Sequence, residues 1–213
     1  MSVLVKICGI TNVEDAEAAV QAGADALGFV FFPRSPRFVK IDTAAYIVRN
    51  IPSHIWRVGV FVNPSKDLLT EAIDACGLTV IQLHGDETPE VCSQVLQLGV
   101  QVMKAFRVKD ISVMKEVERY RADYVLLDTY IEHAYGGTGA AFNWEIGREI
   151  VAKGMKVFLA GGLTPENVAD AVRIVKPFGV DVSSGVEHSP GRKDPARLRA
   201  FIRAAKSVDL QEI

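Results

Sequence analysis

The chain has 213 residues, 49% of them hydrophobic and 23% charged, which is enough to bury a large core. Its 24 Lys and Arg residues against 26 Asp and Glu residues give a net charge of −2, which argues against a nucleic-acid partner. No apolar run approaches the roughly 20 residues of a membrane span, and the start lacks a signal-peptide core, so we expect no membrane partner and a cytoplasmic location.

The composition also bounds the domain organisation. No Pro/Gly/Ser-rich linker divides the chain, so we expect residues 1–213 to form a single domain. The three cysteines, Cys8, Cys76 and Cys92, are far apart and form no Cys-x-x-Cys pair. This spacing indicates neither a disulfide framework nor a zinc site, and the histidines offer no metal-ligand spacing, so we expect no metal.

Short apolar segments alternate along the chain with stretches of helical period, a pattern typical of parallel βα units. Eight strands are predicted, and they begin near Val3, Ala26, Trp56, Val80, Gln101, Tyr124, Lys156 and Gly179. Helix starts are predicted where an N-cap oxygen combines with a following glutamate or proline. These places are Thr11 with Glu14, Thr88-Pro89, Thr164-Pro165 and Asp194-Pro195.

Eight βα units predict a single closed α/β barrel of the TIM type, with parallel strands. The alternative is an open doubly wound sheet, which usually carries a Gly-rich fingerprint directly after its first strand. The residues at that place, 7–11, read ICGIT and hold one glycine. A GTG triplet at residues 137–139 lies well past the end of its strand, so the barrel is favoured.

Several predicted strands carry polar side chains among apolar ones. These residues are Lys6, Cys8, Gln82, His84, Lys104, Asp128, Asp181 and Ser183. A barrel interior built for stability alone is apolar, and active sites form at the carboxyl ends of barrel strands. We therefore expect the polar residues to meet at that end. The alternative is a buried network of ion pairs that serves only the fold.

Two of these residues are candidates for acid–base chemistry. Cys8 ends the first strand beside Lys6 and a helix start, which should draw the thiol toward thiolate, a base or nucleophile. Asp128 closes the apolar run VLLD, where apolar surroundings favour a protonated carboxyl that can donate a proton. The alternatives are a small packing residue for Cys8 and a turn cap for Asp128. Cys76 and Cys92 fall on predicted helices and are interpreted as packing residues.

The loops after the last two strands are glycine-rich and predict a phosphate site. They carry Gly161 and Gly162 in one loop and Ser184 and Gly185 in the other. Such loops bind phosphate in many barrels, which implies a phosphorylated small molecule as ligand. Tight turns alone are the alternative explanation.

Two further residues are expected to bind the ligand. His84 is interpreted as a hydrogen-bond donor to the ligand rather than as a catalyst, whereas His54, His133 and His188 are assigned to surface or loop. Arg37, in the segment FPRSPR, suits a second anion such as a carboxylate. A solvated basic loop is the alternative for Arg37.

A series of motifs spans essentially the whole chain. They are KICGIT (6–11), SPR (35–37), QLHGDE (82–87), LLD (126–128), GGTG (136–139) with Phe142 and Trp144, AGGL (160–163), DVSSGVE (181–187), Pro190-Gly191 and Lys193-Asp194. In this order they resemble the phosphoribosylanthranilate isomerase family of tryptophan biosynthesis. The resemblance implies a TIM-barrel enzyme without cofactor or metal. It would convert N-(5-phosphoribosyl)anthranilate into 1-(2-carboxyphenylamino)-1-deoxyribulose 5-phosphate by an Amadori rearrangement.

The resemblance also implies roles for single residues. Asp128 would protonate the ribose ring oxygen, and Cys8 would then remove a proton from C2 of the opened sugar. Arg37 would hold the anthranilate carboxylate. The other implied residues bind or line the pocket: the amides around Gly161, Gly162, Ser184 and Gly185 hold the phosphate, and His84 and Asp181 line the wall.

Two other functions remain as alternatives. One is another phosphate-binding barrel enzyme of amino-acid biosynthesis, and the other is a non-catalytic sugar-phosphate-binding barrel. The second would keep the anion sites but would not need both Cys8 and Asp128. For the assembly, we expect a monomer or a homodimer.

Overall fold

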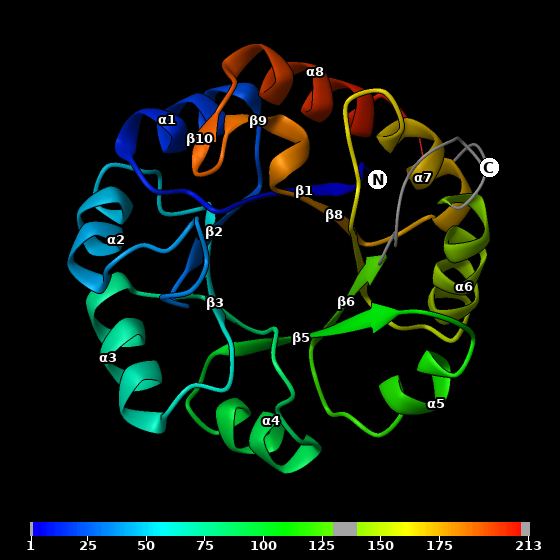
Figure 1. The fold of residues 1–213 in the computed structure, drawn as a ribbon, viewed down its shortest axis with the longest axis horizontal. Helices are drawn as coiled ribbons and strands as arrows, with labels where there is room; N and C mark the ends of the chain where they lie inside the picture. Colours follow the sequence, from blue (N-terminus) through cyan, green and yellow to red (C-terminus); the bar gives the residue numbers. More distant parts are fainter. Residues whose placement is uncertain (1, 130–139, 210–213) are drawn as a thin grey trace.

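The strands close into a ring with its helices outside (Figure 1). The computed structural model describes residues 2–129 and 140–209, and within them eight parallel strands form a closed barrel in chain order. The strands are β1 (Leu4–Cys8), β2 (Ala26–Val30), β3 (Trp56–Phe61), β4 (Val80–Leu83), β5 (Gln101–Val108), β6 (Tyr124–Thr129), β7 (Val157–Ala160) and β8 (Gly179–Val182). β8 pairs with β1, so the first and last strands meet.

The helices surround this barrel. They are α1 (Val13–Ala22), α2 (Ile41–Val48), α3 (Lys66–Cys76), α4 (Pro89–Leu96), α5 (Val113–Val117), α6 (Ala140–Ala152), α7 (Val168–Val175) and α8 (Pro195–Lys206). After β8 the chain forms a 3-10 turn, η1 (Ser184–Val186), and a hairpin of β9 (Glu187–Ser189) and β10 (Arg192–Lys193). α8 then packs beside α1. In the described ranges, no helix is long and apolar enough to cross a membrane.

The predicted barrel is confirmed, and the strand starts agree closely with the sequence pattern. Six of the eight strands begin at the predicted residue, and β1 and β7 begin one residue later. Two helix caps are confirmed as well. Thr88 caps α4, and Asp194 caps α8 by accepting from two backbone N–H groups.

Two predicted helix starts are wrong. The N-cap of α1 is Asn12 rather than Thr11, because the Thr11 hydroxyl donates to the Gly191 carbonyl at 2.6 Å. α7 begins after Asn167, because Thr164 lies in a turn that the Asn167 side chain closes. In both places the residue that the local pattern predicts as the cap makes a different hydrogen bond in the folded chain.

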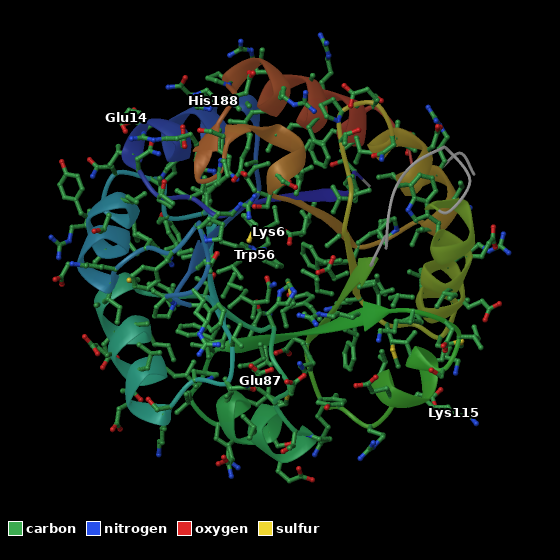
Figure 2. The ribbon with its side chains drawn as sticks, in the orientation of Figure 1. Lys6, Glu14, Trp56, Glu87, Lys115 and His188 are labelled. Atoms are coloured by element: carbon green, nitrogen blue, oxygen red, sulfur yellow. The ribbon has the colours of Figure 1, made fainter. Side chains whose placement is uncertain are left out.

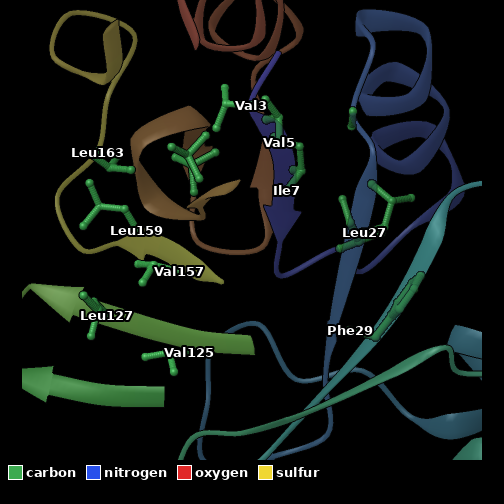
Figure 3. Close-up of a cluster of buried hydrophobic side chains, with 14 of the residues drawn as sticks. Val3, Val5, Ile7, Leu27, Phe29, Val125, Leu127, Val157, Leu159 and Leu163 are labelled. Carbon is green, nitrogen blue, oxygen red and sulfur yellow. The ribbon is translucent and has the colours of Figure 1, made fainter. Parts of the chain in front are cut away.

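The apolar core has two layers with the strands between them. The outer layer lies between strands and helices, and Figure 3 shows part of it on β1, β2, β6 and β7, with Val5, Leu27 and Leu127 among its members. The inner layer fills the barrel with side chains from the other strand face, among them Val58 and Met103. Each strand is therefore buried on both faces, as parallel sheets usually are.

Aromatic rings fill the amino-terminal end of the barrel. Trp56 and Tyr124 begin β3 and β6, and their ring centroids lie 5.3 Å apart. Trp56 lies near the centre of the ring of strands (Figure 2). Phe158 meets Tyr124 edge-on, and Phe178 stacks on Tyr124 at 5.5 Å. This packing leaves the opposite end, at the carboxyl ends of the strands, for a cavity.

Lys104 departs from the expectation that the polar strand residues meet at the barrel mouth. It shares the outer face of β5 with Val102 and Phe106. Its buried ammonium donates to Glu87 at 3.0 Å and to the Gly85 carbonyl at 2.7 Å. Glu87 lies beside α4, outside the barrel (Figure 2). For Lys104 the alternative interpretation, an ion pair that serves only the fold, therefore holds, because the pair lies between the strand and the helix.

Removing the cation of this pair should destabilise the fold strongly. Lys104→Met leaves the buried Glu87 carboxylate without its counter-ion, which should lower the free energy of unfolding by about 3–5 kcal/mol. Urea unfolding measures this loss. The double variant Lys104→Met/Glu87→Gln, which leaves no buried charge, should recover part of it. A single variant as stable as the wild type would contradict this account of the pair.

Candidate active site

A cavity of about 450 Å³ opens at the carboxyl ends of the strands. It brings together eight of the nine site residues predicted from the sequence: Cys8, His84, Asp128, Gly161, Gly162, Asp181, Ser184 and Gly185. Gln82 and Ser183 also line it. The ninth predicted residue, Arg37, is not among the lining residues. The barrel thus collects residues that lie far apart in the sequence at one end of the fold.

The floor of the cavity carries a buried ion pair. Lys6 is fully buried near the centre of the barrel and donates to Asp181 Oδ1 at 2.8 Å (Figure 2). Burial by itself lowers the pKa of Lys6, but the attraction of Asp181 and Cys8 outweighs it and raises the pKa above its ordinary value. Lys6 is therefore a fixed positive charge beneath the cavity.

Cys8 lies at the end of β1 against Val30 and Val60 of the neighbouring strands. Gly28 on β2 leaves room for the thiol, since a Cβ there would stand 2.9 Å from Cys8 Sγ. Burial is the largest influence on this thiol and raises its pKa, although Lys6 opposes the shift. The expectation that the thiol is drawn toward thiolate is therefore wrong. Desolvation outweighs the nearby ammonium, and the thiol is protonated at neutral pH.

Asp128 and His84 meet at the mouth of the cavity. His84 Nε2 lies 3.3 Å from Asp128 Oδ2, and His84 Nδ1 lies 2.8 Å from the side-chain nitrogen of Gln82. The Asp128 side chain is 35% exposed, so it is open to a ligand, whereas Gln82 is fully buried. A carboxyl group from β6 and the Cys8 thiol from β1 thus line the same cavity.

The loops after β7 and β8 form one end of the cavity. Gly161 and Gly162 have φ angles of +80° and +66°, a left-handed conformation that other residues rarely adopt. Gly185 lies so close to the first loop that a Cβ would stand 1.9 Å from the Leu163 carbonyl oxygen. Ser183 Oγ, which also lines the cavity, lies near Gly9 and has no hydrogen-bond partner among the described residues. Glycine loops packed in this way are typical of phosphate sites in barrels.

Arg37 stands at the rim, paired with a carboxylate of the protein. Its Nε donates to Glu187 Oε1 at 2.8 Å, and its Nη2 donates to Glu187 Oε2 at 2.6 Å. The Arg37 side chain crosses Gly9, the residue after Cys8, where a Cβ would lie 2.5 Å from Arg37 Cδ. Glu187 takes two of the five guanidinium N–H groups, and the other three have no hydrogen-bond partner among the described residues.

A buried lysine of the hairpin connects Arg37 to the ends of two strands. Lys193 Nζ donates to the Cys8 carbonyl at 2.6 Å, the Ser183 carbonyl at 3.3 Å and Glu187 Oε1 at 2.8 Å. Burial acts to raise the pKa of Glu187, but hydrogen bonds from Arg37 and Lys193 lower it below its ordinary value. Glu187 is therefore an ionised carboxylate shared by two cations, and it sets the orientation of Arg37.

Sequence reasoning does not assign the groups that support this site. Glu187 and Lys193 lie in a hairpin with neither strand nor helix periodicity, so no pattern places them beside Arg37. Gln82 stands out as a polar residue in an apolar strand, but that signal does not reveal its partner His84. The sequence signal that could have found these three residues is their place in the motifs: Glu187 in DVSSGVE, Lys193 in KD and Gln82 in QLHGDE.

The remaining predicted residues are placed as follows. His54 and His188 are exposed, as predicted for surface or loop residues. Cys76 and Cys92 are buried on α3 and α4, where burial raises the pKa of each thiol to about 11. The GGTG motif (136–139) and His133 lie outside the described residues.

The chain is similar in sequence to one family along almost its full length. The profile of the family described as N-(5'phosphoribosyl)anthranilate (PRA) isomerase matches residues 5–204. A relative from Geobacter sulfurreducens, named N-(5'-phosphoribosyl)anthranilate isomerase, is 54% identical over 204 residues. The matched region covers 96% of this chain and 98% of the relative.

Solved structures of such isomerases share the fold, and each of three covers 97% of this chain and 100% of its own. The crystal structure of phosphoribosyl anthranilate isomerase from Thermotoga maritima has a TM-score of 0.89 at 42% identity. A second structure, with a TM-score of 0.87 at 40% identity, is a complex with reduced 1-(o-carboxyphenylamino)-1-deoxyribulose 5-phosphate. A third, with a TM-score of 0.86 at 40% identity, shows monomers generated from the dimeric Thermotoga maritima isomerase. By sequence and by fold, the chain belongs to the N-(5'-phosphoribosyl)anthranilate isomerase family.

Proposed function

We propose that this chain isomerises N-(5'-phosphoribosyl)anthranilate to 1-(2-carboxyphenylamino)-1-deoxyribulose 5-phosphate in tryptophan biosynthesis, with Asp128 as the acid and Cys8 as the base. The observation that carries the proposal is that both residues line one cavity together with the glycine loops after β7 and β8. An acid–base isomerisation of a phosphorylated sugar needs a proton donor, a proton acceptor and an anion site. This cavity supplies all three from four different strands.

The phosphate is assigned to the loops at Gly161, Gly162, Ser184 and Gly185. Their close backbone approach supports this end of the site. The anthranilate is assigned to the opposite side, near Arg37. There the apolar side chains of Val30, Val60 and Phe32 cluster beside Cys8 and suit an aromatic ring, and the free N–H groups of Arg37 suit its carboxylate.

The reaction then runs in two proton transfers. Asp128 gives its proton to the ribose ring oxygen while the C1–O bond breaks, and the lone pair of the anilino nitrogen forms an iminium. The Cys8 thiolate removes the proton from C2, and the electron pair of that C–H bond forms the C1=C2 bond of an enolamine. The enolamine gains a proton at C1 and loses one from its C2 hydroxyl to give the ketone. The iminium makes C2–H acidic enough for a thiolate base.

The thiol must lose its proton before it can act as this base. Lys6 and Lys193 both favour the thiolate, since each lowers the pKa of Cys8 against the larger effect of burial. We assign to these two ammonium groups the stabilisation of the charged form of the base. Lys6 acts through a hydrogen bond to the thiol, and neither ammonium group contacts the substrate in this proposal.

We further propose that residues 1–213 act as one catalytic unit in the cytoplasm, as a monomer or a homodimer. The small phosphorylated substrate is the only partner that this activity requires. Sedimentation equilibrium distinguishes the two assemblies.

A turnover assay with N-(5'-phosphoribosyl)anthranilate tests the proposed function. Cys8→Ala and Asp128→Asn should each lower kcat by at least roughly 10²- to 10⁴-fold, because each removes one positioned acid or base. Their unfolding curves and phosphate affinity should stay near those of the wild type. Cys92→Ala, which removes a buried thiol away from the cavity, is the matched control and should keep its turnover.

Three results would contradict the proposal in different ways. A fully active Cys8→Ala enzyme would remove the thiol from the mechanism. A sugar adduct on Cys8, trapped by quenching during turnover and seen by mass spectrometry, would make the thiol a nucleophile. A wild-type protein that binds sugar phosphates but turns over no substrate would establish the non-catalytic alternative.

The rate at which Cys8 is alkylated should report its raised pKa. Because burial raises this pKa, the thiol is mostly protonated at neutral pH, and only the thiolate reacts, so the rate constant for alkylation by iodoacetamide should rise with pH through the range from about 6 to 8. Mass spectrometry of the Cys8 peptide at successive times measures this rate. A rate constant already flat across this range would show that the thiol ionises more easily than its burial allows.

Arg37→Ala should separate the two ends of the substrate. The variant should bind an anthranilate-bearing ligand, such as the reduced product, about 10- to 100-fold more weakly, because a charge-assisted hydrogen bond is lost. Its affinity for ribose 5-phosphate should stay close to that of the wild type. Isothermal titration of both ligands measures the difference, and an equal loss for both would overturn the assignment.

A further inference from the structure

Gln82, His84 and Asp128 form a chain of hydrogen bonds along one wall of the cavity. Gln82 Nε2 lies 2.8 Å from His84 Nδ1, and His84 Nε2 lies 3.3 Å from Asp128 Oδ2. Gln82 and His84 stand two residues apart, and successive side chains of a strand alternate, so both point to the same face at the end of β4. β6, which is separated from β4 only by β5, brings Asp128 to the far end of this chain of hydrogen bonds.

The direction of each hydrogen bond follows from the chemistry of the groups. An amide nitrogen only donates, so His84 Nδ1 accepts from Gln82. A neutral imidazole carries one N–H, which must then be on Nε2, where it donates to Asp128 Oδ2. We propose that Gln82 is a positioning residue that holds His84 in this tautomer, so that His84 stabilises the charge that Asp128 acquires on donating its proton.

This inference rests on the proposed role of Asp128 as the acid, and it gives His84 a role in the same step. A protonated carboxyl can accept a hydrogen bond on one oxygen and donate its proton from the other. With Oδ2 held by His84, the proton is on Oδ1. As the proton leaves, the carboxylate becomes negative, and the hydrogen bond from His84 Nε2 strengthens because its acceptor is now charged.

Fold stability does not account for a glutamine at this place. Gln82 is fully buried inside the barrel, and its Oε1 has no hydrogen-bond partner among the described residues. A buried acceptor without a partner destabilises the fold, a penalty that an apolar side chain of similar shape avoids. What the amide supplies in return is the donor that faces His84.

Other charged or titratable groups surround this chain of three, but they do not replace it. In the wall and floor of the cavity these groups are Cys8, Asp181 and Lys6. His84 also lines a neighbouring cavity, where they are Asp86, Lys104, Arg107, Glu116 and Tyr120. Within residues 2–129 and 140–209, the hydrogen bonds of His84 and Asp128 side chains are the two given above. The donor to Asp128 is therefore His84.

The tautomer of His84 can be read directly from the wild-type protein. Nitrogen-15 NMR of histidine side chains distinguishes a protonated ring nitrogen from an unprotonated one, and the spectrum of His84→Gln identifies which signals belong to residue 84. We expect the single proton of the neutral His84 ring to be on Nε2. A proton on Nδ1 would overturn the proposal without any measurement of activity.

Gln82→Met tests the positioning role, since methionine has a similar volume but no donor. The variant should show a mixture of the two His84 tautomers and a kcat about tenfold lower, with KM nearly unchanged. A merely structural change would lower kcat without changing the tautomer of His84.

A double-variant cycle separates Gln82 from its target. In the His84→Gln background residue 84 donates through an amide, which has no tautomers, so adding Gln82→Met should not lower kcat further. An equal effect of Gln82→Met in both backgrounds would overturn the proposal. An inactive Asp128→Asn enzyme together with a fully active Gln82→Met enzyme would leave the proposed function standing and would refute this inference alone.

Discussion

The barrel closes where β1 meets β8, and two buried lysines hold this seam. Lys6 and Asp181 are register partners, and their side chains form an ion pair across 175 residues of sequence. Lys193 binds the carbonyl groups of Cys8 and Ser183, at the ends of the same two strands. Apolar packing alone tolerates shifts between strands, whereas charged hydrogen bonds require one register. The closure of the fold therefore depends on groups that also border the cavity.

Because the groups that close the barrel also border the cavity, the chemistry of the site depends on the seam between β1 and β8. The ammonium groups of Lys6 and Lys193 act on the Cys8 thiol and partly offset the effect of its burial. Lys193 also binds Glu187, which in turn orients Arg37. Groups that join the first and last strands thus stand beside the proposed base and beside the proposed carboxylate site. A change that loosens the seam would also disturb both.

The sequence predicts the barrel and most of its cavity for a simple reason. Parallel strands place their carboxyl ends together, so a polar residue at the end of each apolar run is placed by the topology alone. Cys8, Asp128 and Asp181 follow this rule. Arg37 lies in a loop, so its pairing with Glu187 follows from no pattern. The protonation of Cys8 depends on how its desolvation compares with nearby charges, which a sequence does not reveal.

Lys104 shows the limit of the same argument. Strands buried on both faces are apolar on both faces, so alternation separates the faces without saying which one is inside. The two buried pairs, Lys6–Asp181 and Lys104–Glu87, have the same chemistry and similar distances of 2.8 and 3.0 Å. Asp181 lines the cavity above Lys6, whereas Glu87 and Lys104 lie between β5 and α4 and do not line it. The face of the strand, and not the ion pair itself, therefore decides which pair belongs to the site and which belongs to the fold.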